Sequence, residues 1–237
     1  MKAGQLALGF PVLERDPAQT LIAVSSQAAA RAALAQWRDW PGGTLLLVGD
    51  AGAGKSHLAA VWAQDTAARA IDLALEAGAL IGGGDFDART LVVEDVDRRI
   101  GEPTQHVEAA LIALLDAVKA ERTGPLLLTA RVRPPKWAVR TPDLVSRLAV
   151  PPVVEIEAAT DEDLASVFEK QLADRGATPA PGLTEYVLRR AHRSFGALER
   201  LAGGLDTLAL ERKQRISRNL ARELLGEPES GEEGDHD

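Results

Sequence analysis

The sequence predicts an α/β protein in which a five-stranded parallel sheet, flanked by helices, precedes a small all-helical domain. Between residues 44 and 158, short apolar runs alternate with helical stretches. A glycine-rich pattern that is typical of phosphate-binding loops joins the first apolar run to the helix after it. Beyond Ala158 the apolar residues recur only at helical spacing. These three observations favour an α/β core with a helical domain appended to it.

The strands of the sheet are predicted from five short apolar runs. Their side chains are apolar on both sides of an extended chain, which is typical of parallel strands that helices cover on both faces. The runs are 44–48, 70–73, 90–94, 125–129 and 153–156, and the helices between them are 55–68, 105–122 and 142–148. An alanine-rich helix, 25–40, precedes the first run and ends at Pro41.

The same pattern divides the chain into four parts. Residues 1–20 contain two prolines and little periodicity, so we expect an extended arm. Residues 21–158 form the α/β domain, and 227–237 hold six acidic residues without Lys or Arg, which indicates a solvated tail. The helical domain covers 159–226, with helices expected at 161–175, 182–192, 195–213 and 217–225.

The composition excludes several classes of protein. The 237 residues include no cysteine, which excludes disulfides, thiolate metal sites and cysteine nucleophiles. The net charge is −8, but six of the negative charges lie in 227–237, so the rest of the chain is nearly neutral. This balance gives no reason to expect direct sequence-specific DNA binding. The longest apolar runs are only as long as strands, so we expect no membrane span and a cytoplasmic location.

A phosphate-binding loop follows the first strand. The segment 49–56, GDAGAGKS, matches the pattern G-x-x-x-x-G-K-[ST], with a strand before it and a helix after it. Glycines let the loop curl so that backbone N–H groups point at phosphate oxygens, and the helix N-terminus adds positive potential. Lys55 supplies a charge to the β- and γ-phosphates, and the Ser56 hydroxyl is a ligand for Mg²⁺. We expect the nucleotide to contact Gly49, Ala51, Gly52, Ala53, Gly54, Lys55, Ser56 and His57.

Two acidic residues end the third strand. The run 90–94 is followed by Asp95, so Glu94 and Asp95 stand side by side at the end of a buried strand, where a cation would offset their charge. We predict Glu94 as the acid on the magnesium side and Asp95 as the residue that orients an attacking water. An exposed boundary between strand and loop is the alternative. Thr129, at the end of the fourth strand, either senses the γ-phosphate or reflects ordinary β-propensity.

Several of these residues resemble the AAA+ ATPases of the DnaA family. The resemblance runs from about Leu21 to Leu225 and is greatest to Hda-type regulators of the DnaA initiator. It implies a AAA+ core with a helical lid domain, and adenine as the base. The residues that carry it are Gly-Lys-Ser-His57-Leu58, the Glu94-Asp95 strand and, most selectively, Arg133-Pro134-Pro135 with Pro142-Asp143-Leu144-Val145-Ser146-Arg147-Leu148.

The resemblance implies that Arg147 is an arginine finger, which points into the nucleotide site of a neighbouring molecule. A guanidinium presented in this way neutralises charge on the transferring phosphoryl group. The alternative is an ion pair with Asp143, four residues earlier on the same short helix.

One position departs from the family. The sensor arginine of the lid is replaced by Gly196, and Arg193 and Arg200 lie three residues before it and four after it. We therefore expect that the protein hydrolyses ATP only weakly by itself. We expect it to bind ADP or ATP, together with Mg²⁺, largely as a structural ligand. Ile22 and Val24 are expected to contact the base.

The N-terminal arm carries a second motif. Gln5-Leu6-Ala7-Leu8-Gly9-Phe10 fits Q-x-x-L-x-F, a peptide by which many replication proteins bind the bacterial sliding clamp. An extended peptide can place Leu8 and Phe10 in an apolar pocket while the Gln5 amide forms hydrogen bonds, and Leu6 lies between them. The alternative is an apolar arm that packs on its own core. Hda-type proteins are similar in carrying such a motif.

These observations favour a clamp-associated regulator that stimulates hydrolysis of ATP bound to the initiator DnaA. The helix-turn-helix domain found beyond the lid in initiators is not expected, and the basic stretch 212–222 is expected to be the exposed face of a packed helix. A helicase loader or adaptor of the same family is the first alternative, and a small-molecule phosphotransferase is the second. Self-association is left open.

Overall fold

The computed structural model describes residues 22–83, 89–100 and 106–226. The predicted arm, 1–20, and the predicted tail, 227–237, lie outside the described residues, and with them the clamp motif from Gln5 to Phe10. Among the described residues, every helix is too short or too polar to cross a membrane.

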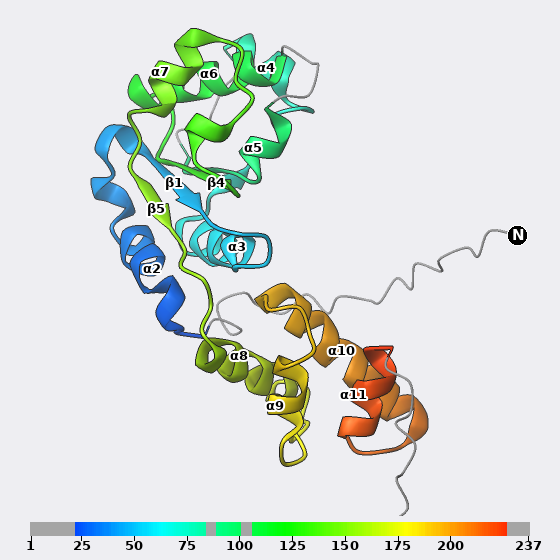
Figure 1. Cartoon of the computed structure of the whole chain (residues 1–237). Coiled ribbons are helices and arrows are strands. Elements are labelled where there is room, and N and C mark those ends of the chain that lie inside the picture. The colour runs from blue at the N-terminus through cyan, green and yellow to red at the C-terminus, as the bar shows by residue number, and fades with distance from the viewer. Residues whose placement is uncertain (1–21, 84–88, 101–105, 227–237) are drawn as a thin grey trace, which may run out of the picture.

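The predicted five-stranded parallel sheet is confirmed. All neighbouring strands pair in parallel, in the order β2-β3-β4-β1-β5. The carboxyl ends of β1, β3 and β4, which are neighbours, therefore meet at one edge of the sheet (Figure 1). The strands are β1 (Thr44–Val48), β2 (Arg69–Ala70), β3 (Leu91–Val93), β4 (Leu126–Ala130) and β5 (Val153–Glu155).

Helices cover both faces of the sheet, as the apolar runs predict. Leu46 in β1 packs in one buried cluster with residues of α4, α6 and α7, whereas its neighbours Leu45 and Leu47 pack in another with α2 and α3 (Figure 1). This alternation follows from the two-residue period of a strand. The helices of the core are α2 (Ala28–Ala35), α3 (Lys55–Thr66), α4 (Ala77–Ile81), α5 (Val96–Arg99), α6 (His106–Lys119) and α7 (Pro142–Leu148).

Three details of the core differ from the sequence prediction. Strand β2 ends at Ala70 because the Asp72 carboxylate accepts hydrogen bonds from the backbone N–H groups of Ala74 and Leu75, which forms a turn. The predicted helix 25–40 is divided into a 3-10 turn, α2 and a second 3-10 turn, and Trp40 folds back so that its indole donates to the Ala33 carbonyl. The short helices α4 and α5 were not expected.

The lid domain consists of four helices around a separate buried cluster. Phe168 and Leu172 of α8 and Leu205 of α10 are fully buried in this cluster. Val24, which precedes the core, belongs to the same cluster, so the first described residues pack against the lid. The helices are α8 (Asp161–Ala173), α9 (Leu183–Leu188), α10 (Phe195–Arg212) and α11 (Arg218–Leu224).

Asp163 joins the lid to the segment before α2. Its carboxylate, 5% exposed, accepts hydrogen bonds from the backbone N–H groups of Ser25, Ser26 and Thr160 at 2.9, 3.3 and 3.3 Å. Burial raises the pKa of this carboxyl, but the hydrogen bonds outweigh burial and bring the pKa to about 2, below the ordinary 3.8. The ionised form of Asp163 therefore stabilises the junction between core and lid.

We predict that Asp163→Asn lowers the free energy of unfolding by roughly 2 kcal/mol at pH 7. Because the folded-state pKa is depressed, this stabilisation is complete above about pH 4 and is lost as the pH falls towards 2. Urea unfolding of both proteins from pH 7 to pH 2.5 should show the difference between them shrinking. A difference that is constant over this range would contradict the assignment.

Candidate nucleotide-binding site

The loop between β1 and α3 has the curled backbone that its glycines predict. Gly52 and Gly54 have φ values of 79° and 93°, a region that side-chain-bearing residues rarely adopt. A Cβ on Gly52 would lie 2.6 Å from the Ser194 Cβ, and one on Gly54 would lie 2.3 Å from the Gln27 amide nitrogen. These positions require glycine for both conformation and space.

The loop borders a cavity of about 310 Å³ between the sheet edge and the lid. Among the residues singled out from the sequence, ten line it: Ile22, Val24, Ala51, Gly52, Gly54, Lys55, Ser56, His57, Asp95 and Gly196. Gly49, Ala53, Glu94, Thr129, Arg147 and Arg193 do not line it.

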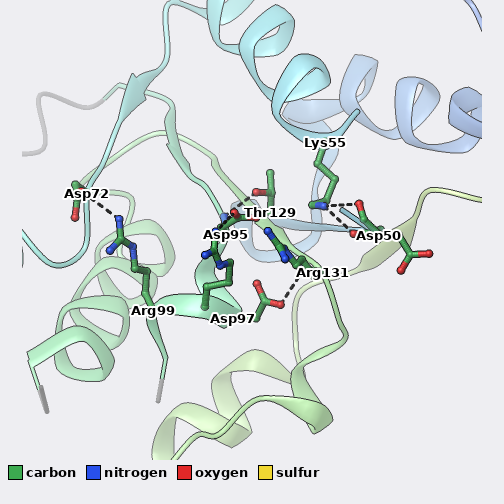
Figure 2. Close-up of polar contacts among 10 residues, drawn as sticks. Asp50, Lys55, Asp72, Asp95, Asp97, Arg99, Thr129 and Arg131 are labelled. Carbon is green, nitrogen blue, oxygen red and sulfur yellow. Dashed lines mark hydrogen bonds and ion pairs between the residues drawn. The ribbon is translucent and has the colours of Figure 1, made fainter. Parts of the chain in front are cut away.

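Lys55 is held by the loop itself. Its ammonium, in a residue that is 6% exposed, donates to the carbonyl oxygens of Gly49 and Asp50 at 2.7 and 2.9 Å (Figure 2). Burial lowers the pKa of Lys55, and the carboxylate of Asp95 opposes this shift. A group with three donors still has one to offer to a phosphate oxygen.

Asp95 and Thr129 meet at the ends of β3 and β4. The backbone N–H of Asp95 donates to the Thr129 hydroxyl oxygen at 3.0 Å, and Asp95 has a left-handed backbone with φ 49° (Figure 2). Thr129 is 1% exposed, and its hydroxyl accepts the backbone N–H of Asp95, a residue that lines the cavity. Sensing of the γ-phosphate by Thr129 stays a prediction.

Glu94 does not reach this cavity. It is exposed and lines a different cavity, together with Asp72 and Arg99. Strand β3 ends at Val93, and the left-handed backbone of Asp95 turns the chain there, so Glu94 and Asp95 line different cavities. The position does not support the magnesium-side role predicted for Glu94. At the sheet edge, Asp95 is the carboxylate that lines the cavity beside the phosphate-binding loop.

The donor set of the cavity fits Mg²⁺. Magnesium prefers oxygen ligands, namely one or two from protein side chains together with phosphate oxygens and water. The Ser56 hydroxyl and the Asp95 carboxylate line the same cavity and are oxygen donors of this kind. They are the residues that would hold the ion, which when bound neutralises phosphate charge.

His57 follows Ser56 at the start of α3 and also lines the cavity. Burial lowers the pKa of its imidazole, an effect that the Glu199 carboxylate partly opposes. His57 is therefore neutral at pH 7. Its Nε2 atom is buried and has no hydrogen-bond partner within the described part of the chain.

The lid contacts the loop directly. The backbone N–H of Phe195, the first residue of α10, donates to the Gly52 carbonyl at 3.0 Å. The next residue, Gly196, lines the cavity. Arg193 pairs with Asp161 on the surface of the lid and does not line the cavity. An Arg200 nitrogen lies 3.6 Å from where a Gly196 Cβ would stand, but Arg200 is exposed and does not line the cavity.

Arg147 lies away from its own nucleotide cavity. It is on α7, which leads into the start of β5, and strand starts lie at the edge opposite to the phosphate-binding loop (Figure 1). Its side chain is 29% exposed, and its guanidinium pairs with Asp143 at 2.9 Å and with Asp116 of α6. The pair with Asp143 is the alternative expected from the sequence, and the carboxylate of Asp116 adds to it. These pairs hold Arg147 at the surface.

Six residues of the cavity were missed by sequence reasoning. Arg131 follows the fourth apolar run directly, and its position at a strand end was a usable signal. The others come from the lid or from the segment before α2, so only the packing of the domains reveals them. The six are Gln27, Arg131, Val167, Gln171, Phe195 and Glu199.

Comparisons with known proteins agree with this geometry. No protein-family model matches the chain. An uncharacterized protein of Haemophilus influenzae is 24% identical over 184 residues, which cover 75% of this chain and 79% of that protein. Domain III of the replication initiation protein DnaA from Thermotoga maritima superimposes with a TM-score of 0.72 at 17% identity, covering 88% of this chain and 94% of that one.

Two further solved structures are similar over most of the chain. DnaA from Aquifex aeolicus, bound to AMPPCP, gives a TM-score of 0.64 at 19% identity and covers 81% of this chain and 66% of that one. The RuvB Holliday junction branch migration motor of Thermotoga maritima gives 0.63 at 16% identity, with 85% and 66% covered. The chain therefore has the same fold as domain III of DnaA.

We predict that Gly52→Ala strongly weakens nucleotide binding, because the added Cβ would clash with Ser194 and separate the loop from the lid. Gly83→Ala is a matched control: Gly83 also has a positive φ, but a Cβ there meets nothing within 4 Å. Calorimetric titration with Mg-ADP should show the loss for Gly52→Ala alone. Equal affinities for the two variants would contradict the prediction.

We predict that Thr129→Val destabilises the protein by about 1 kcal/mol or more, because the N–H of Asp95 loses its acceptor. Thr129→Ser keeps the hydroxyl and should be close to wild type. Urea unfolding measures both variants. If Thr129→Val and Thr129→Ser have the same free energy of unfolding, the hydrogen bond does not hold Asp95 in place.

Proposed function

We propose that this protein is a nucleotide-binding AAA+ regulator of chromosome replication, which stimulates hydrolysis of the ATP bound to a DnaA-type initiator. The fold supports the proposal, because the chain superimposes on DnaA domain III over 88% of its length. The cavity supports the nucleotide part, since it joins a phosphate-binding loop, a buried lysine and a carboxylate at the sheet edge.

The nucleotide is ADP or ATP with Mg²⁺. DnaA of the same fold has been solved with AMPPCP, an ATP analogue, which favours an adenine nucleotide in this chain also. Apolar side chains of the lid side, Val167 and Phe195, join Ile22 and Val24 in the cavity and offer a surface for a base.

The position of Arg147 is the observation that carries the regulatory part. Arg147 stands at the edge of the core opposite to its own loop, half-buried at the surface, and this position supports a role at a site outside this chain. Val145 and Val150 beside it are 55% and 69% exposed, which is the apolar surface that a protein partner would cover. A guanidinium supplied in trans stabilises the charge of a transferring phosphoryl group.

Glu108 fixes the helix that carries Arg147. Its carboxylate accepts hydrogen bonds from the backbone N–H groups of Arg140 and Thr141 at 2.8 and 2.9 Å, just before α7 begins. Burial raises the pKa of Glu108, but these hydrogen bonds outweigh burial and hold the pKa below its ordinary value. The start of α7 is therefore fixed to α6. A helix held in this way keeps Arg147 in a defined position, which suits an arginine that acts on another molecule.

The remaining parts of the proposal concern the chain's own chemistry and its anchor. Gly196 in place of a lid arginine favours weak hydrolysis by the isolated protein, so a turnover of many ATP per second would count against the proposal.

The motif from Gln5 to Phe10 would tether the protein to the sliding clamp by the Gln5 amide and the apolar side chains of Leu8 and Phe10.

We predict that Arg147→Ala abolishes stimulation of initiator ATP hydrolysis and leaves clamp binding intact, because the transferring phosphoryl group loses its guanidinium. Leu8→Ala with Phe10→Ala should abolish clamp binding, and with it stimulation by clamp-bound protein. Arg133→Ala, an exposed arginine paired with Glu155, is the control and should behave as wild type. Phosphate release from initiator-bound ATP, in the presence of DNA-loaded clamp, measures stimulation.

Wild-type stimulation by both variants would refute the proposal. A stable complex with a replicative helicase, combined with no stimulation of initiator hydrolysis by the wild-type protein, would instead support a helicase loader or adaptor of the same fold.

A further inference from the structure

Two carboxylates hold the guanidinium of Arg147, and the proposed function gives neither of them a role. The Nε of Arg147 donates to the Asp143 carboxylate at 2.9 Å, and its Nη1 donates to the Asp116 carboxylate of α6. The third nitrogen, Nη2, forms no hydrogen bond or ion pair within the described ranges. Of the five N–H groups of a guanidinium, the two on Nη2 are therefore open to a ligand.

The packing of α7 on α6 brings these side chains together. The two helices lie side by side, and Leu148 of α7 is buried in the same apolar cluster as Leu111 and Leu114 of α6 (Figure 1). Arg147, the residue before Leu148, stands at the border of this contact, with its side chain 29% exposed. Burial thus fixes the backbone that carries Arg147, and the two carboxylates fix its side chain.

The two ion pairs contribute little to the stability of the fold. The side chains of Asp116 and Asp143 are 43% and 53% exposed, and ion pairs at such exposure are weak because water screens them. They do restrict the arginine. An arginine side chain has many rotamers, and holding it in one of them costs conformational entropy. Arg147 has lost this freedom before it meets a ligand, so a contact made by Nη2 does not include that cost.

The shape of a guanidinium favours contact at Nη2 over an exchange of partners. Its three nitrogens lie at the corners of a plane, and the carboxylates occupy the corners of Nε and Nη1. A phosphate group that displaced both carboxylates would leave them unpaired beside a further anion, and like charges repel. A phosphate group that binds at Nη2 leaves both ion pairs in place. The two carboxylates therefore determine which corner of the guanidinium meets the ligand.

We propose that Asp116 and Asp143 are positioning residues, which present the Nη2 of Arg147 to a phosphate group bound by another molecule. The proposal deepens the proposed function and rests on the role of Arg147 in trans. Neither carboxylate touches the phosphate group, so both act through the arginine.

The first arm of the test measures the arginine itself, in the full chain and without an initiator. NMR relaxation of the Nε–H group reports how far the side chain is immobilised, and the Arg147 signal is identified by its absence from Arg147→Ala. We expect a rigid Arg147 in the wild-type protein, a more mobile one in Asp116→Ala, and the greatest mobility when Asp143→Ala is added. Equal rigidity in the wild-type protein and the double variant would overturn the proposal.

The second arm measures stimulation of initiator ATP hydrolysis while this protein is titrated in the presence of DNA-loaded clamp. Asp116→Ala should lower the maximal rate about two- to tenfold, the range for immobilising one flexible side chain, and leave the half-saturating concentration unchanged. Asp116→Asn keeps an oxygen acceptor for Nη1 and should recover most of the rate. Asp143→Ala and Asp143→Asn should differ in the same way.

Asp174→Ala is the matched control. Asp174 lies in the lid and pairs with Lys170, four residues earlier, at 2.7 Å, so its loss also breaks an ion pair at helical spacing. This variant should keep the wild-type maximal rate. Urea unfolding should place Asp116→Ala close to the wild-type protein, and a large loss of stability would show a structural role and overturn the proposal.

Distinct results separate the failure of this inference from that of the proposed function. If Asp116→Ala stimulates as well as the wild-type protein, or better, the carboxylate does not position the arginine. A raised half-saturating concentration at an unchanged maximal rate would also overturn the inference, because it would assign Asp116 to the docking surface. Wild-type stimulation by Arg147→Ala would instead refute the proposed function, whatever the NMR arm shows.

Discussion

The close approach of three segments at two glycines is the constraint on which the rest of the site depends. Gly52 lies against Ser194 at the start of the lid helix α10, and Gly54 lies against Gln27 before α2. Two hydrogen bonds stabilise these contacts. The backbone N–H of Phe195 donates to the Gly52 carbonyl, and the Gln27 amide donates to the Ala53 carbonyl. Any side chain on these glycines would push the segments apart, so the loop, the lid and the N-terminal segment form one nucleotide cavity only because the loop has no Cβ there.

The parallel sheet positions the polar residues of that cavity and separates them from the surface that carries Arg147. Because the strands are parallel, the phosphate-binding loop, Asp95 and Arg131, which follow strands, and Thr129, in the last two residues of β4, all lie at one edge. The connection before β5 returns to the other edge and carries Arg147 there. The candidate nucleotide site and Arg147 thus lie at opposite edges of the sheet, which is the arrangement that the proposed action on another molecule requires.

Local sequence patterns predicted most of the helices and strands. The features that they did not predict depend on packing between segments that are far apart in the chain. Thr44–Val48 and Pro142–Leu148 have the predicted bounds, because each lies between clear turn or capping signals. Which of Glu94 and Asp95 lines the cavity depends on the left-handed turn at Asp95 after β3, which two adjacent acids do not reveal. The pair of Arg147 with Asp143 follows from helical spacing, but Asp116 is 31 residues away in the chain and only the packing of α6 on α7 brings it near. Phe195 and Gln171 reach the cavity through the placement of the lid, which no local pattern encodes.

The central claim is that the cavity between loop and lid binds one Mg-nucleotide in each chain. Calorimetric titration of the purified wild-type protein with Mg-ADP, beside Lys55→Ala, tests it most directly, because Lys55 begins α3 and donates to the loop carbonyls of Gly49 and Asp50. The account predicts saturable binding of one nucleotide per chain, abolished by the substitution. Absence of binding by the wild-type protein, or equal binding by the two, would contradict it.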